Sequence, residues 1–189
     1  MVEAISRLLV TRAVSYPSID VVMTKRDIDS AFRLRRLRLA LSLLMCAELP
    51  GGYPVYSHDL VLIYLAMPIG RNGAPANFLL FGDSIACIHG KFGPGRLDRF
   101  LTLPFRSKLY AGNGLILETR NIARQNGSVS LRGKLTLGLL GPQATKQSKI
   151  AAEGQWIATH TMLGFNIDAH SLSTSLPGAT IAGARFVFD

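Results

Sequence analysis

The acidic side chains of the chain are few, and any metal site or acid–base mechanism must draw on them. Twelve Asp and Glu residues stand against 21 Lys and Arg residues, which gives a formal net charge of +9. Asp27 follows a short apolar run at Val21–Met23 and begins the segment Asp27-Ile28-Asp29-Ser30-Ala31-Phe32. Taken alone, this segment is a weak signal, because most acids in such positions are surface residues.

A second segment, residues 67–78, is more specific. It reads Met-Pro-Ile-Gly-Arg-Asn-Gly-Ala-Pro-Ala-Asn-Phe, so an apolar run enters a Pro/Gly turn and then a Gly-Ala-Pro helix start. Glycines in such a turn allow the backbone to approach another group closely. A plain strand–turn–helix connection is the alternative interpretation. Two later segments complete the set: Leu-Tyr-Ala-Gly-Asn-Gly-Leu-Ile at 109–116, and Leu163-Gly164-Phe165, which Lys149 precedes.

In this order and at this spacing, the four segments resemble the palm domain of the reverse transcriptases of retroelements. The resemblance extends from about Lys25 to Phe165. It implies an RNA-directed DNA polymerase that uses Mg²⁺ for two-metal nucleotidyl transfer. It also implies an RNA or DNA template–primer and a deoxynucleoside triphosphate as partners.

The resemblance assigns a role to each matching residue. Asp27 corresponds to a catalytic, metal-binding aspartate, and Lys149 to the lysine that assists the leaving pyrophosphate. Phe32 corresponds to the aromatic gate that would clash with a ribose 2′-hydroxyl. The platform for template and nucleotide corresponds to Gly70, Asn72, Gly73, Ala74 and Pro75.

The third segment departs from the family at the residues that matter most for catalysis. Where the family has Tyr–x–Asp–Asp, this chain has Tyr110-Ala111-Gly112-Asn113. Gly112 has no side chain, and Asn113 offers only a neutral oxygen, a poor substitute for a carboxylate at a magnesium site. A two-metal mechanism needs several converging carboxylates. We therefore expect a polymerase rate reduced by about a thousandfold or more, in effect an inactive enzyme.

The elements that would position these residues indicate an α+β fold, a palm-like antiparallel sheet packed against helices, with partial fingers. Strands are expected at Val21–Met23, over 37–43, where Leu alternates with other residues, in the apolar run 60–67, which we interpret as buried, and within 156–167. A hairpin is expected over 105–118, with its turn at Asn113-Gly114.

One helix is predicted with more detail. Pro75 suits the first turn of a helix, because its missing N–H would be unpaired there in any case. Phe78, Phe81, Ile85 and Ile88 then fall on one face. Residues 119–139 are ambiguous, because Gly127 and Gly133 weaken any helix there.

The chain is interpreted as one partial reverse-transcriptase domain over residues 1–189, with the palm core at about 20–168. Fingers, thumb and RNase H regions are expected to be largely or wholly absent, because only 26 residues precede Asp27. No apolar run is long enough for a membrane span, and no secretory signal is visible. We expect an intracellular protein, in the cytoplasm or nucleus, that is neither secreted nor bound to a membrane.

Two further features bear on partners. Cys46 and Cys87 are expected to be buried free thiols, with no disulfide-linked partner. Six cations crowd one short stretch, which indicates either contact with nucleic-acid phosphates or a solvated basic face: Lys25, Arg26, Arg33, Arg35, Arg36 and Arg38. Two alternatives to a reverse-transcriptase-like protein therefore stay open, a non-catalytic basic nucleic-acid-binding module and an unrelated basic α+β protein.

Overall fold

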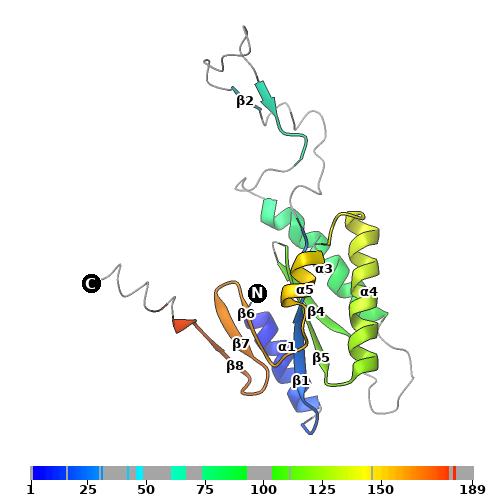
Figure 1. The fold of residues 1–189 in the computed structure, drawn as a ribbon, viewed down its shortest axis with the longest axis vertical. Coiled ribbons are helices and arrows are strands. Elements are labelled where there is room, and N and C mark those ends of the chain that lie inside the picture. The colour runs from blue at the N-terminus through cyan, green and yellow to red at the C-terminus, as the bar shows by residue number, and fades with distance from the viewer. Residues whose placement is uncertain are drawn as a thin grey trace.

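A three-stranded antiparallel sheet in the order β1–β5–β4 lies at the centre of the chain (Figure 1). Its strands are β1 (Val21–Lys25), β5 (Asn113–Thr119) and β4 (Arg106–Tyr110). The computed structural model describes residues 2–15, 17–29, 31, 42, 46–48, 61–66, 74–92, 104–110, 112–145, 147–178 and 181.

Strand β5 is the middle strand and is covered on both faces. It pairs with β1 from Val21↔Thr119 to Lys25↔Leu115, and with β4 from Arg106↔Leu117 to Tyr110↔Asn113. Leu115, Ile116 and Leu117 are all buried, although successive side chains of a strand point to opposite faces. Apolar layers must therefore lie on both sides of the sheet.

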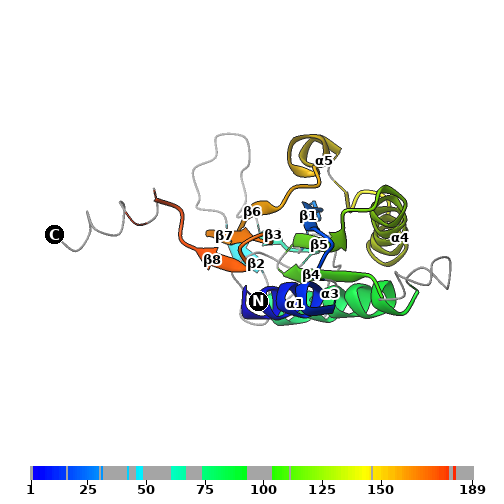
Figure 2. The same cartoon turned by 90° about the horizontal axis from the view of Figure 1, so that it is seen from below.

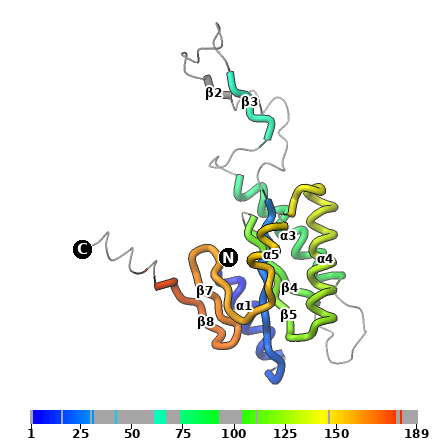
Figure 3. The backbone as a smooth tube through the Cα atoms, in the orientation of Figure 1, coloured from blue at the N-terminus to red at the C-terminus, as the bar shows by residue number. Residues whose placement is uncertain are grey.

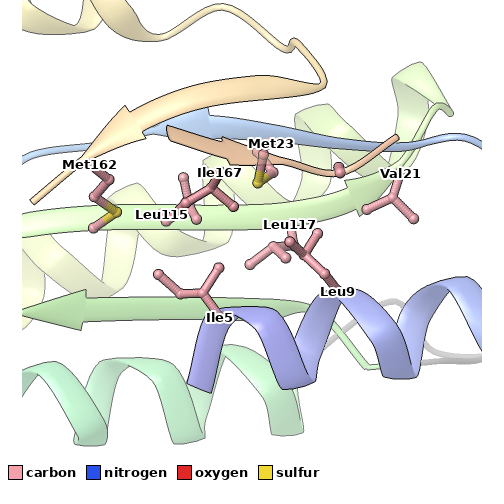
Figure 4. Close-up of a cluster of buried hydrophobic side chains, with 9 residues drawn as sticks. Ile5, Leu9, Val21, Met23, Leu115, Leu117, Met162 and Ile167 are labelled. Atoms are coloured by element: carbon pink, nitrogen blue, oxygen red, sulfur yellow. The ribbon is translucent and has the colours of Figure 1, made fainter. Parts of the chain in front are cut away.

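Helix α1 (Val2–Ser15) covers one face together with a second small sheet. Ile5 and Leu9 lie one turn apart and face Leu115 and Leu117 of β5, as Figure 4 shows. The second sheet has the order β6–β7–β8, with β6 at Thr159–Met162, β7 at Phe165–Asp168 and β8 at Ser173–Ser175. Met162 and Ile167 extend from it into the same apolar cluster.

Helices α3 (Ala74–Lys91) and α4 (Ile122–Leu140), which Figure 2 shows beside the sheet, contribute to a second apolar cluster. Phe78 and Ile85 of α3 contact Leu109 of β4 there. Gly82 allows the close approach of α3 to β4, because a Cβ at this position would lie 3.1 Å from the Leu109 carbonyl oxygen. The predicted helix is thus confirmed, and of its predicted face Phe78 and Ile85 are buried while Phe81 and Ile88 are half-buried.

The short helix α5 (Gln147–Glu153) and the segment after it lie along the open side of β1 (Figures 1 and 2). Met23 and Ile157 exchange two backbone hydrogen bonds, of 2.8 and 3.0 Å. This bridge continues the sheet beyond β1 and brings α5 over the end of the strand. The expected strand within 156–167 is confirmed as β6 and the start of β7, joined by a turn at Leu163-Gly164.

Strands β2 (Cys46–Glu48) and β3 (Val61–Ile63) form a separate antiparallel pair, away from the main sheet in Figure 3. The strand expected within 60–67 is present at Val61–Ile63, but the expectation that it is buried is wrong. Its three residues are each more than 40% exposed. An apolar run predicts a strand but does not say what covers it. Within the expected strand over 37–43 only Ser42 is described, and its backbone is helical.

Residues 119–139, left ambiguous by the sequence, are mostly helical as α4. The Asn121 side chain caps this helix by accepting a hydrogen bond from the Arg124 backbone N–H, at 3.1 Å. Gly127 and Gly133 both lie within the helix. Their low propensity is outweighed by the cap and by a buried face that runs from Arg124 to Leu140.

Three remaining expectations can be compared with the described residues. The α+β class is confirmed, with helices separated along the chain by groups of antiparallel strands. Cys87 is a free thiol but is exposed, so its expected burial is wrong. No helix in the described part of the chain combines the length and the apolar character that crossing a bilayer needs.

Candidate functional site

The chain leaving β1 runs alongside the tip of the β4–β5 hairpin and places Asp27 there. The Arg26 N–H donates to the Gly114 carbonyl at 2.9 Å, and the Ile28 N–H donates to the Gly112 carbonyl at 2.7 Å. Between them, Asp27 Oδ1 accepts the Gly114 N–H at 3.3 Å. Two segments more than 80 residues apart are thereby joined by both backbone and side chain.

The hairpin turn lies two residues before the expected position. Tyr110 and Asn113 form the last pair of the ladder, so the turn lies before Asn113 and includes Gly112. Gly112 has a φ of +93°, which favours glycine because other residues are strained there. The prediction of a turn at Asn113-Gly114 is therefore wrong, although the hairpin itself is confirmed.

Gly114 has a different role from the one expected of it. A Cβ at this position would lie 2.2 Å from the Arg26 carbonyl oxygen. A glycine is needed because the chain on either side of Asp27 approaches β5 so closely.

Lys149 of α5 pairs with the second carboxylate oxygen of Asp27. Its Nζ lies 3.1 Å from Asp27 Oδ2. The Asp27 side chain is 6% exposed and that of Lys149 is 49% exposed. The hydrogen bond and the charge of Asp27 raise the pKa of Lys149, which keeps its amine protonated.

A second ion pair joins the same two elements. Lys25, at the end of β1, pairs with Glu153 at the end of α5. The hydrogen bond from Lys25 lowers the pKa of Glu153. Thr24 Oγ1 donates to the Gly154 carbonyl at 2.8 Å, and Arg26 lies against the same residue. Neither Glu153 nor Thr24 was singled out from the sequence, since no local pattern links β1 to the end of α5.

A layer of buried charges lies between the sheet and its helices. The Glu118 side chain is fully buried and pairs with Arg12 at 3.0 Å and with Arg124 at 2.6 Å. It therefore cannot serve as a substitute acid at the hairpin. Arg132 of α4 donates to Ser107 at 3.0 Å, and burial lowers its pKa to about 10.

The candidate residues from the sequence divide into three groups. Asp27, Lys149, Gly112 and Asn113 come together at the hairpin, and Tyr110 is 38% exposed beside them. Ala74 and Pro75 begin α3, with Ala74 buried and Pro75 exposed. The remaining candidates, Phe32, Gly70, Asn72 and Gly73, lie outside the described residues.

The residues at the hairpin do not fit a two-metal centre. Such a centre needs several carboxylates converging on the ions. Here Asp27 contributes the carboxylate beside the turn, Lys149 already neutralises it, and Gly112 and Asn113 contribute none. Across the described ranges, no three His, Cys, Asp or Glu side chains are grouped so that they could hold a metal ion.

Comparison with known proteins leaves the chain unassigned. No family model matches it, and no curated protein sequence matches it.

Proposed function

We propose that this protein is a reverse-transcriptase-like palm that binds a nucleic-acid template–primer without extending it. The observation that carries the proposal is the hydrogen bond between Asp27 Oδ1 and the Gly114 N–H of the hairpin. The resemblance implies this juxtaposition, since both segments would contribute to one catalytic centre. The segments are distant in sequence, so their meeting supports the assignment independently of the motifs.

The sheet order and its helical layers are further support. A three-stranded antiparallel sheet, with the Asp27 segment and the Tyr110–Gly114 hairpin at one end and helices α3 and α4 on one face, is compatible with a palm. The order of the segments along the chain agrees with the resemblance as well.

The absence of extension follows from the charges at the hairpin. Asp27 is a carboxylate that accepts a hydrogen bond from Gly114 of the hairpin, and it is paired with Lys149. Nucleotidyl transfer by two metals would need carboxylates at Gly112 and Asn113, and neither residue has one. Binding needs only cations for the phosphates, and the net charge is +9.

The test compares two variants that lose the same charge. In the first, the sequence cluster Arg33, Arg35, Arg36 and Arg38 is changed to Gln. In the matched control, four exposed and scattered cations are changed to Gln: Arg7, Lys91, Arg120 and Lys134.

Template–primer affinity is measured by filter binding across a salt series for both variants and the wild type. We expect the cluster variant to lose at least about tenfold in affinity and to show a shallower salt slope, because phosphate contacts release counterions. The control variant should lose less. Equal losses in both variants would indicate nonspecific attraction, and no binding by the wild type at low salt would leave an unrelated basic protein as the better interpretation.

A further inference from the structure

We propose that Lys149 is the resident cation of the Asp27 site, and that α5 is held over this site by charge rather than by apolar packing. The inference rests on the proposed function in one respect, since it takes Asp27 as the position at which a palm would bind a metal ion. It goes further by proposing that the Lys149 amine takes the position beside Asp27 that a metal ion would occupy in a palm.

The carboxylate of Asp27 is engaged at both oxygens. Oδ1 accepts the Gly114 N–H and Oδ2 accepts Lys149 Nζ. A divalent cation approaching Oδ2 would meet the positive charge of the amine, and it would find neutral residues at 112 and 113. The amine supplies the positive charge that the buried carboxylate needs, so the site is stable without a metal ion.

The two ion pairs match in spacing. Lys149 and Glu153 are four residues apart in α5, so they lie on one helix face about 5–6 Å apart. Lys25 and Asp27 are two residues apart in extended chain, so they lie on one side, about 6–7 Å apart. In both segments the cation precedes the anion along the chain, and the ion pairs place the two segments in opposite directions, so each cation meets an anion.

Apolar packing contributes little to this contact. None of the seven residues of α5 is buried. Besides the two ion pairs, the contact includes the hydrogen bond from Thr24 to the Gly154 carbonyl. A segment held in this way should respond to ionic strength, because salt screens partly exposed ion pairs. It should respond to Mg²⁺ only as it responds to any other salt.

The experiment measures amide hydrogen exchange of residues 147–153, with α3 as an internal reference. Lys149→Met and Glu153→Gln each remove one ion pair and leave the buried core unchanged. Lys134→Met is the matched control, because Lys134 is exposed on α4. We expect both test variants to accelerate exchange in α5 by about two- to fivefold, as the loss of a partly exposed ion pair implies.

Salt provides the second arm of the experiment. In the wild type, NaCl should accelerate exchange in α5, and MgCl2 at equal ionic strength should have the same effect. Protection of the segment by Mg²⁺ beyond NaCl would overturn the inference, and so would exchange that neither variant changes. These rates do not involve nucleic acid, so a failure of template–primer binding would contradict the proposed function and leave this inference standing.

Discussion

Gly114 and Arg26 lie so close together that a Cβ at position 114 would fall 2.2 Å from the Arg26 carbonyl oxygen. The same glycine donates its N–H to Asp27, so one residue sets both the approach of the backbone and the position of the carboxylate. The Asp27 site therefore depends on a residue that has no side chain.

Replacing Gly114 with Ala should be strongly destabilising. The added methyl group would force the chain around Asp27 away from β5 and break the contacts that hold it, at a cost of about 2–4 kcal/mol. Urea unfolding measures this change. Gly133→Ala is the control, since nothing lies within 4 Å of its Cβ position and the helix should gain about 0.5–1 kcal/mol. An equal effect of both substitutions would contradict the close approach.

Restoring acids to the hairpin should not have equal effects at the two positions. Gly112→Asp should cost about 1–2 kcal/mol, because φ there is +93° and a Cβ would lie 3.1 Å from that of Ala31. Asn113 lies in a regular strand, so Asn113→Asp should cost less stability than Gly112→Asp. Urea unfolding of the two single variants provides the comparison. The opposite ranking would show that residue 112 is not in the turn.

The buried carboxylate of Glu118 should be important for stability. Glu118→Gln would leave Arg12 and Arg124 buried with one partner charge removed, and we expect a loss of about 3–5 kcal/mol in the free energy of unfolding. Glu3→Gln is the control, because Glu3 pairs with Arg7 at a site where both side chains are more than 75% exposed. Its effect should stay within about 0.5 kcal/mol. A loss at Glu118 no larger than at Glu3 would contradict the buried network.

The free energy of unfolding should fall in acid because the unfolded chain takes up a proton at His89. Burial lowers the pKa of His89 to about 4 from the ordinary 6.5, so the unfolded chain binds a proton that the folded chain does not bind between these values. This contribution to stability is therefore fully present above about pH 6.5 and is lost as pH falls toward 4, by about 3 kcal/mol.

The measurement for His89 is the pH dependence of urea unfolding between pH 8 and pH 4. In His89→Gln the slope should be shallower than in the wild type, whatever the absolute stability of the variant. His170→Gln is the control, because His170 is exposed, and it should retain the wild-type slope. A wild-type slope in His89→Gln would assign the effect to other groups.

Local sequence patterns predicted helices and strands better than they predicted the turns that connect them. Phe78 and Ile85 repeat at the helical period, so α3 could be placed from sequence. Asn113-Gly114 is the better turn pair locally, yet the turn is at 112 because Gly114 is needed against Arg26. Turn propensity cannot anticipate a contact from a segment nearly 90 residues earlier.

The candidate site was predictable only in part, for the same reason. Asp27 and Lys149 were selected by their resemblance to a family, and the structure brings them together. The pairing of Glu153 with Lys25, and of Glu118 with Arg12, depends on how distant elements pack, so no sequence period indicates it. The sequence shows which residues are charged, but it does not show which of them form ion pairs with one another.

Template–primer binding without extension can be measured in a single experiment, which follows template–primer retention and primer elongation in the same samples of the wild-type protein, with Mg²⁺ and with Mn²⁺. Between about 50 and 200 mM salt, we predict retention that weakens steeply, as phosphate contacts require, and no elongated product above the protein-free blank. Elongation of the primer, or no retention even at the lowest salt, would contradict a palm that binds template–primer without extending it.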